Sequence, residues 1–173
     1  MISYVLSVLG EDRAGLVEAL SGVVTAHGGN WERSHMTQLA GKFAGVVLVT
    51  VPSAQSEGFL EALSPLQEQG LLDISVEAGR MPEVGESPTL RVELVGNDHP
   101  GIVHEVSQLL ARHKVNIDDL QTWTAEAPMH GGTLFHATAI VRLPAGLAAE
   151  ELSASLETLA TDLMVDIEVA GTG

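Results

Sequence analysis

The sequence contains the same loop pattern twice, once in each half. Residues 9–17 read Leu-Gly-Glu-Asp-Arg-Ala-Gly-Leu-Val, and residues 95–103 read Val-Gly-Asn-Asp-His-Pro-Gly-Ile-Val. Both contain Gly-x-Asp-x-x-Gly, and the two halves stay in register as far as an asparagine, Asn30 in the first and Asn116 in the second. Self-similarity of this kind indicates repeated structural units rather than one continuous core. We therefore predict two modules with a common fold.

The segment 80–88 separates the two copies. It is mostly polar, contains two prolines and a glycine, and lacks apolar periodicity, which is typical of a linker. We therefore place module 1 at residues 1–79, the linker at 80–88 and module 2 at 89–173. Module 2 is longer because of an insertion within 126–132, where Pro128 and a Gly-Gly pair indicate an extended loop between two strands.

Both modules show the same order of hydrophobic patterns. Apolar residues alternate before each loop, as in a strand with one buried face, and follow a helical stripe after it. Pro100 suits the first position of the helix in module 2. Two strands follow, at 30–39 and 42–51 in module 1 and at 116–125 and 134–143 in module 2, and then a second helix and a last strand. The order βαββαβ predicts an α+β, ferredoxin-like fold with a four-stranded antiparallel sheet and both helices on one face.

Composition limits the classes of partner. The 173 residues carry a net charge of −15, which disfavours direct binding to nucleic acid or to an anionic membrane. There is no cysteine, and the apolar N-terminus has the alternation of a strand without the basic segment of a signal peptide. No apolar run approaches the roughly 20 residues that span a bilayer. We predict a cytoplasmic protein.

The two loops are candidate ligand sites on physical grounds. A glycine at the end of a strand permits unusual backbone angles and close approach, and the free N–H groups at the start of a helix suit a carboxylate. The aspartate in each loop can accept the ammonium group of an amino acid, or it can simply cap the helix. Arg13 in module 1 corresponds to His99 in module 2, so we expect two unequal sites. The loop residues concerned are Gly10, Asp12, Arg13 and Gly15 in module 1, and Gly96, Asp98, His99 and Gly101 in module 2.

These loop sequences, the helix after them and the βαββαβ order resemble ACT domains across nearly the whole chain. Two ACT domains without an attached enzyme resemble the glycine cleavage system transcriptional repressor family in particular. The resemblance implies a non-catalytic regulator that senses an amino acid, such as glycine or serine, at domain interfaces and acts through a protein partner. It also implies that Asn30 and Asn116 face the ligand, although either can instead be a turn residue that satisfies its own backbone.

Two other functions remain open. The chain can be a detached regulatory subunit or diverged piece of an enzyme such as formyltetrahydrofolate deformylase, or a structural adaptor whose pockets are vestigial. We find no nucleophile elbow, P-loop or dinucleotide fingerprint, and therefore predict neither catalytic residues nor a cofactor.

The remaining predictions concern metals, tryptophans and oligomeric state. The seven histidines lack the spacing of a helix-borne metal site, so we predict no metal ligand. Trp31 and Trp123 are interpreted as strand residues that pack at an interface between modules. A sheet covered on one face only leaves its other face and edges open, so we expect modules or chains to pair, with a homodimer as the expected assembly.

Overall fold

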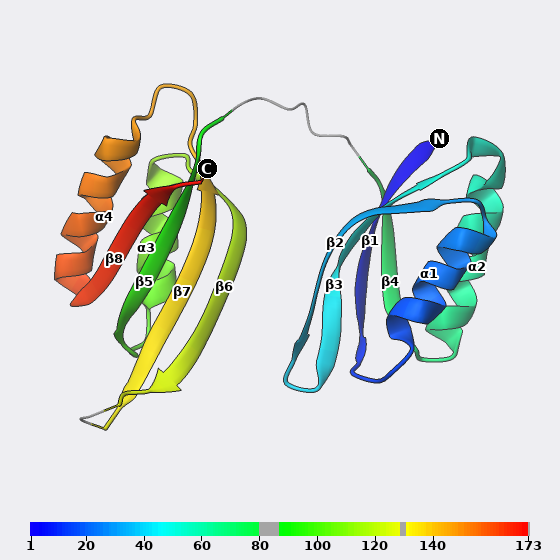
Figure 1. The fold of residues 1–173 in the computed structure, drawn as a ribbon, viewed down its shortest axis with the longest axis horizontal. Helices are drawn as coiled ribbons and strands as arrows, with labels where there is room; N and C mark the ends of the chain where they lie inside the picture. Colours follow the sequence, from blue (N-terminus) through cyan, green and yellow to red (C-terminus); the bar gives the residue numbers. More distant parts are fainter. Residues whose placement is uncertain (80–86, 129–130, 173) are drawn as a thin grey trace. The chain divides into compact units, whose positions relative to one another are not determined.

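The computed structural model describes residues 1–79, 87–128 and 131–172. The chain divides into two compact units, Met1–Glu83 and Val84–Gly173, each built around its own sheet (Figure 1). Most of the predicted linker lies outside the described residues. Its last residue, Pro88, accepts a hydrogen bond of 2.9 Å from the backbone N–H of Leu143 and is thereby tied to module 2.

Module 1 contains the predicted βαββαβ order plus one short 3-10 helix. Its sheet has the strand order β2-β3-β1-β4, with every neighbouring pair antiparallel. The elements are β1 (Ile2–Glu11), α1 (Leu16–Ala26), β2 (Asn30–Leu39), β3 (Lys42–Val51), η1 (Ser53–Gln55), α2 (Ser56–Glu68) and β4 (Asp73–Ala78).

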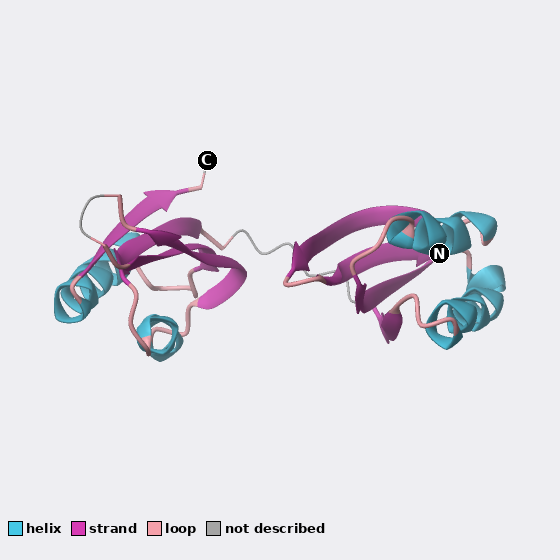
Figure 2. Cartoon of the chain, turned by 90° about the horizontal axis from the view of Figure 1, so that it is seen from below, coloured by secondary structure: helices cyan, strands magenta, loops and turns pink. Residues whose placement is uncertain are grey.

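Module 2 repeats this arrangement with the strand order β6-β7-β5-β8. In each module both helices lie on one face of the sheet (Figure 2), so the predicted α+β, ferredoxin-like fold is confirmed. The insertion extends the β6–β7 hairpin, and its residues Met129 and His130 lie outside the described residues. The elements are β5 (Thr89–Asn97), α3 (Ile102–Arg112), β6 (Asn116–Glu126), β7 (Thr133–Arg142), α4 (Ala149–Leu163) and β8 (Val165–Gly171).

The cores of the two modules differ in continuity. In module 1 the inward residues of β1 and β3 join those of α1 and α2 in a single cluster, with Leu6, Leu20, Val47 and Phe59 fully buried. In module 2 the buried residues form two separate clusters, one around Val141 and Leu152 and a smaller one around Ile102. The partly buried residues Val106 and Ile167 pack against both clusters.

The first helix of each module begins at a left-handed glycine. Gly15 and Gly101 occupy the N-cap positions of α1 and α3 with φ of 93° and 100°. The prediction that Pro100 is the first helical residue is wrong, because the helix begins at Ile102 and Pro100 lies in the turn before the cap. A backbone with such positive φ favours glycine, which has no Cβ to clash with the carbonyl groups.

The same helices end in matched left-handed positions with different residues. Gly28 follows α1 with φ 65°, and its N–H donates to the carbonyl of Thr25. At the equivalent position after α3 the residue is Lys114, with φ 55° and a hydrogen bond to Ala111. A left-handed conformation costs a residue with a Cβ roughly 1–2 kcal/mol, whereas glycine adopts it freely.

Lys114→Gly is therefore expected to stabilise module 2 by about 0.5–1 kcal/mol, once the entropy that glycine loses on folding is deducted. Chemical denaturation followed by the NMR signals of module 2 measures the change. The reverse substitution in module 1, Gly28→Lys, is expected to destabilise by a similar amount. A lower denaturation midpoint for Lys114→Gly would refute this account of the helix end.

Candidate functional site

An open hollow of about 180 Å³ lies at the loop between β1 and α1 of module 1. Its volume is well above the roughly 10–15 Å³ that one water needs. Three of the predicted site residues line it, together with four residues that the sequence analysis did not single out. The lining residues are Asp12, Arg13, Gly15, Leu16, Val17, Glu18 and Phe43.

The first glycine of the loop permits close packing, and the second supplies the left-handed turn. A Cβ on Gly10 would lie 2.5 Å from the backbone oxygen of Leu71, before β4. A Cβ on Gly15 would meet nothing within 4 Å, so its positive φ is what requires glycine. Both properties were expected of the strand-end glycine, but the structure divides them between Gly10 and Gly15.

Backbone hydrogen bonds hold the loop in place in both modules. The N–H of Asp12 donates to the carbonyl of Gly41 in the β2–β3 turn at 2.9 Å, and the N–H of Asp98 donates to Thr133 at 2.8 Å. Neither aspartate side chain caps its helix, so the capping interpretation is wrong for both. Asp12 therefore lines the hollow without a capping role.

The N-terminus of α1 keeps unpaired backbone donors. The first bond of the helix runs from the N–H of Ala19 to the carbonyl of Gly15 at 2.9 Å. The amides of Leu16, Val17 and Glu18 precede it and have no acceptor among the described residues. The helices α2 and α4 also lack side-chain caps, and the first residues of α4 line a hollow as well. In α1 all three of these residues line the same hollow as the loop residue Asp12. The carboxylate of a ligand would accept hydrogen bonds from these amides, and its ammonium group would pair with Asp12.

Arg13 and His99 form similar contacts although they differ in charge and shape. The Nη2 of Arg13 donates to the carbonyl of Gly70, after α2, at 2.7 Å. In module 2 the Nε2 of His99 lies 3.4 Å from the carbonyl of Leu163, at the end of α4. Both side chains thus connect the loop to the end of the second helix. This contact was not visible in the sequence.

The two asparagines lie at the other end of each module. Asn30 begins β2, beyond the C-terminus of α1, and pairs with Thr50 rather than with the loop end of β3. The 11 residues of α1 separate it from the loop by roughly 16 Å, at 1.5 Å per residue. The same is true of Asn116 and α3. One module therefore does not bring its asparagine and its loop into a single site.

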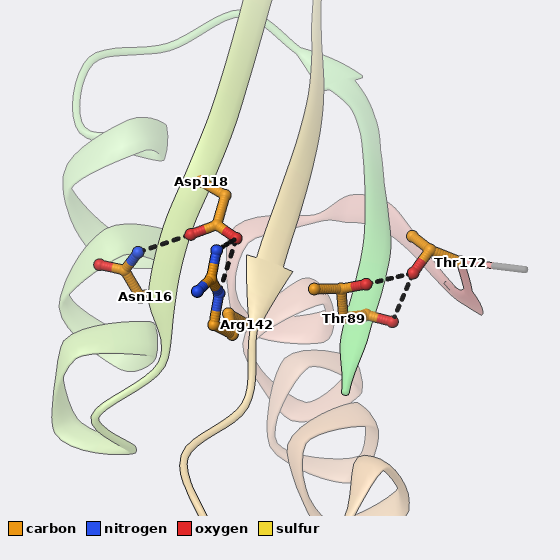
Figure 3. Close-up of polar contacts among 5 residues, drawn as sticks. All are labelled: Thr89, Asn116, Asp118, Arg142 and Thr172. Atoms are coloured by element: carbon orange, nitrogen blue, oxygen red, sulfur yellow. Dashed lines mark hydrogen bonds and ion pairs between the residues drawn. The ribbon is translucent and has the colours of Figure 1, made fainter. Parts of the chain in front are cut away.

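Each asparagine instead binds an acidic residue at a β-bulge. The Nδ2 of Asn116 donates to Asp118 at 2.7 Å, and Asp118 also accepts two hydrogen bonds from Arg142 (Figure 3). The register of β6 against β7 shifts at this aspartate. In module 1 the Nδ2 of Asn30 donates to Glu32 at 2.9 Å, at the matching bulge in β2. The structure thus assigns these asparagines a local structural contact.

These contacts predict a pH effect at Glu32. The hydrogen bond from Asn30, and then that from Thr50, lower the pKa of the Glu32 carboxyl below its ordinary value. The carboxylate therefore stays ionised to lower pH in the folded chain than in the unfolded chain. Its contribution to stability is present above the unfolded pKa and is lost as the pH falls through the lower folded pKa. Asn30→Ala is expected to raise the pKa of Glu32 in a carboxyl-carbon NMR titration, and an unchanged titration curve would contradict the assignment.

The corresponding loop of module 2 has a different surface. Gly96 again permits close packing, because its Cβ would lie 2.4 Å from the Cγ1 of Val165 in β8. A hollow at this end involves Gly96 and Asn97, but the remaining lining comes mainly from α4 and β8. Asp98, His99 and Gly101 do not line it. The two loops therefore have similar backbones but do not line equivalent pockets.

Other candidate features have structural explanations. Within residues 1–79, 87–128 and 131–172, no three His, Asp or Glu side chains gather as metal ligands would, and His130 lies outside these ranges. Trp31 packs against the core of its own module, and Trp123 stacks on His136 with ring centroids 5.1 Å apart. None of the helices in the described part of the chain is long and apolar enough to cross a membrane.

Comparisons with known proteins agree with this architecture. The ACT domain family matches residues 3–77 and again residues 90–156. The glycine cleavage system transcriptional repressor of Escherichia coli K12 is 25% identical over 161 residues, which cover 92% of this chain and 84% of the repressor. The repressor of the same name from Shigella flexneri shows the same values.

Two crystal structures resemble the chain along its whole length. One is an unknown protein from Galdieria sulphuraria, with a TM-score of 0.81, 30% identity and 99% of both chains covered. The other carries a provisional assignment as a glycine cleavage system transcriptional repressor, with a TM-score of 0.71, 19% identity and 99% and 97% coverage. The chain therefore belongs to the ACT domain family, with two ACT domains in tandem, and it is related over nearly its whole length to the glycine cleavage system transcriptional repressors.

Proposed function

We propose that the chain is a non-catalytic regulator that senses an amino acid and controls amino-acid metabolism in the cytoplasm through a protein partner. The observation that carries the proposal is the hollow at the uncapped start of α1, lined by Asp12 and by three residues with unpaired amides. A small zwitterion such as glycine or serine matches these opposite charges. The relationship to a transcriptional repressor and the net charge of −15 favour a partner protein over direct contact with DNA.

Signalling by this route needs two arrangements of the modules or chains. A ligand shifts their populations only if it binds one arrangement more tightly than the other. The uncovered face of each sheet supplies a surface for such pairing, and we propose a homodimer as the assembly that the ligand biases. Asn30 can then contribute to a ligand site only from a neighbouring module, because it lies far from the loop of its own module.

Calorimetry with glycine and serine tests the proposal. Asp12→Asn keeps the shape of the side chain but removes the charge that faces the ammonium group, so binding is expected to weaken at least tenfold, or about 1.4 kcal/mol. Asp162→Asn, on the exposed surface of α4, makes the same charge change away from the hollow and is expected to leave affinity unchanged. Equal affinities for the two variants, or no heat with any of the twenty amino acids at millimolar concentration, would refute the sensor function.

A further inference from the structure

Module 2 contains an apolar cavity between helix α3 and its sheet. The cavity has a volume of about 40 Å³, and apart from Ser107 and Thr122 every lining residue is apolar. A single water needs roughly 10–15 Å³ and two to four polar partners, so this space is large enough for water but chemically unsuited to it. Apolar cavities of this kind stay dry and accept apolar guests.

Some residues that line the cavity are smaller than their counterparts in module 1. β2 and β6 carry their bulges at matching positions, so residues of the two strands can be compared directly. Leu20 and Val47 are fully buried, and Trp31 packs against the same core. Other lining positions change in the opposite direction, because Leu94, Leu110, Leu120 and Ala137 are larger than Val8, Val24, Ser34 and Gly45 in module 1. Module 2 has Val106, Ile117 and Ala139 where module 1 has Leu20, Trp31 and Val47.

The cavity lies between the two buried clusters of module 2. Val106 packs against both clusters, and the buried residues on either side of it do not join. A close-packed interior normally leaves few voids larger than a water.

The cavity also begins where a ligand would enter. Ile102, Val103 and Phe135 line it, and they correspond in the repeat to Leu16, Val17 and Phe43, which line the loop hollow of module 1. Val103 and Leu120 on its lining are each 45% exposed, so the space is reached from the surface. A molecule at the start of α3 can therefore extend an apolar group between α3 and β6.

We propose that this cavity binds a short branched aliphatic group, the side chain of an amino acid such as valine or leucine. The identification of the group as part of an amino acid rests on the proposed function, whereas the apolar cavity does not. Trp31 and Leu20 take up more of the space between helix and sheet in module 1 than Ile117 and Val106 do in module 2. The two modules therefore differ in the ligand that they bind.

Xenon tests the cavity without any involvement of the loop. Methyl NMR spectra of the full chain under xenon pressure are expected to show shifts at Val106, Leu110 and Ile117 and none at Leu20. Val106→Leu restores the residue of module 1 and is expected to abolish the shifts, and Ala139→Val provides a second filling variant. Val95→Leu adds the same methylene on β5 outside the cavity and serves as the control. Equal shifts in both modules, or none in module 2, would contradict the claim that module 2 alone contains an accessible apolar cavity.

Calorimetry with leucine then tests the amino-acid assignment. Val106→Leu is expected to weaken leucine binding about tenfold or more, because the added methylene occupies space that the ligand side chain needs. Glycine binding is expected to stay unchanged. Leucine that binds equally to natural and Val106→Leu chains, or xenon binding without leucine binding, overturns the assignment. Neither result affects the glycine experiment at Asp12, so the two proposals fail separately.

Discussion

Phe59→Ala is expected to destabilise module 1 by about 3–5 kcal/mol. Phe59 is fully buried on α2, with its ring centroid 5.8 Å from that of Tyr4 and 6.1 Å from that of His27. Its removal takes away the largest buried side chain of the module and leaves a cavity between α2 and the sheet. A domain of about 80 residues has roughly 4–12 kcal/mol of stability, so the loss is at least about a quarter of what module 1 has.

The measurement is chemical denaturation of the full chain with NMR signals from both modules. The cores are separate clusters, so the signals of module 1 are expected to disappear at lower denaturant concentration while those of module 2 keep their midpoint. Leu60→Ala, one residue along and 39% exposed, is the control and should cost less than about 1 kcal/mol. A common shift of both modules would contradict their independence.

Gly10→Ala is expected to destabilise module 1 by about 1–3 kcal/mol, because the new Cβ overpacks the space before β4. That Cβ would lie 2.5 Å from the backbone oxygen of Leu71 and 3.0 Å from the Cδ2 of Leu72, and a backbone group has little freedom to move away. The loop that carries Asp12 would shift with it. Ligand affinity is therefore expected to fall together with stability.

Gly22→Ala is the matched control for this substitution. Gly22 lies within α1, a Cβ there meets nothing within 4 Å, and alanine favours the helix by up to about 1 kcal/mol. Thermal unfolding should thus move in opposite directions for the two glycine variants. Destabilisation by Gly22→Ala, or a neutral Gly10→Ala, would show that close packing is not the reason for Gly10.

The sequence was sufficient to predict most elements because their hydrophobic periods are clear. The strands predicted at 30–39 and 42–51 are β2 and β3 within the bounds observed, since β3 is a continuous apolar run rich in valine and the turn between them is short. The helix start in module 2 was misplaced because proline at the first helical position is a local preference, whereas the observed start depends on the left-handed Gly101.

The site was predicted less completely because it depends on contacts between distant residues. The aspartate loop could be found from its repeat, but the bond from Arg13 to Gly70 joins residues far apart in the sequence. Asn30 was grouped with the loop on the resemblance to ACT domains, whereas α1 places the two at opposite ends of the helix. The cavity of module 2 left a signal in the repeats, where Val106, Ile117 and Ala139 replace the larger Leu20, Trp31 and Val47.

The most direct test of the central claim is an NMR titration of the full chain with glycine. If the hollow binds the carboxylate, the backbone amides of Leu16, Val17 and Glu18 should shift downfield in a saturable manner, because each would donate to the ligand. The amides of β3 remote from the loop, such as that of Thr50, should not move. Saturable shifts elsewhere, with these three amides unchanged, would contradict the assignment of the hollow as the amino-acid site.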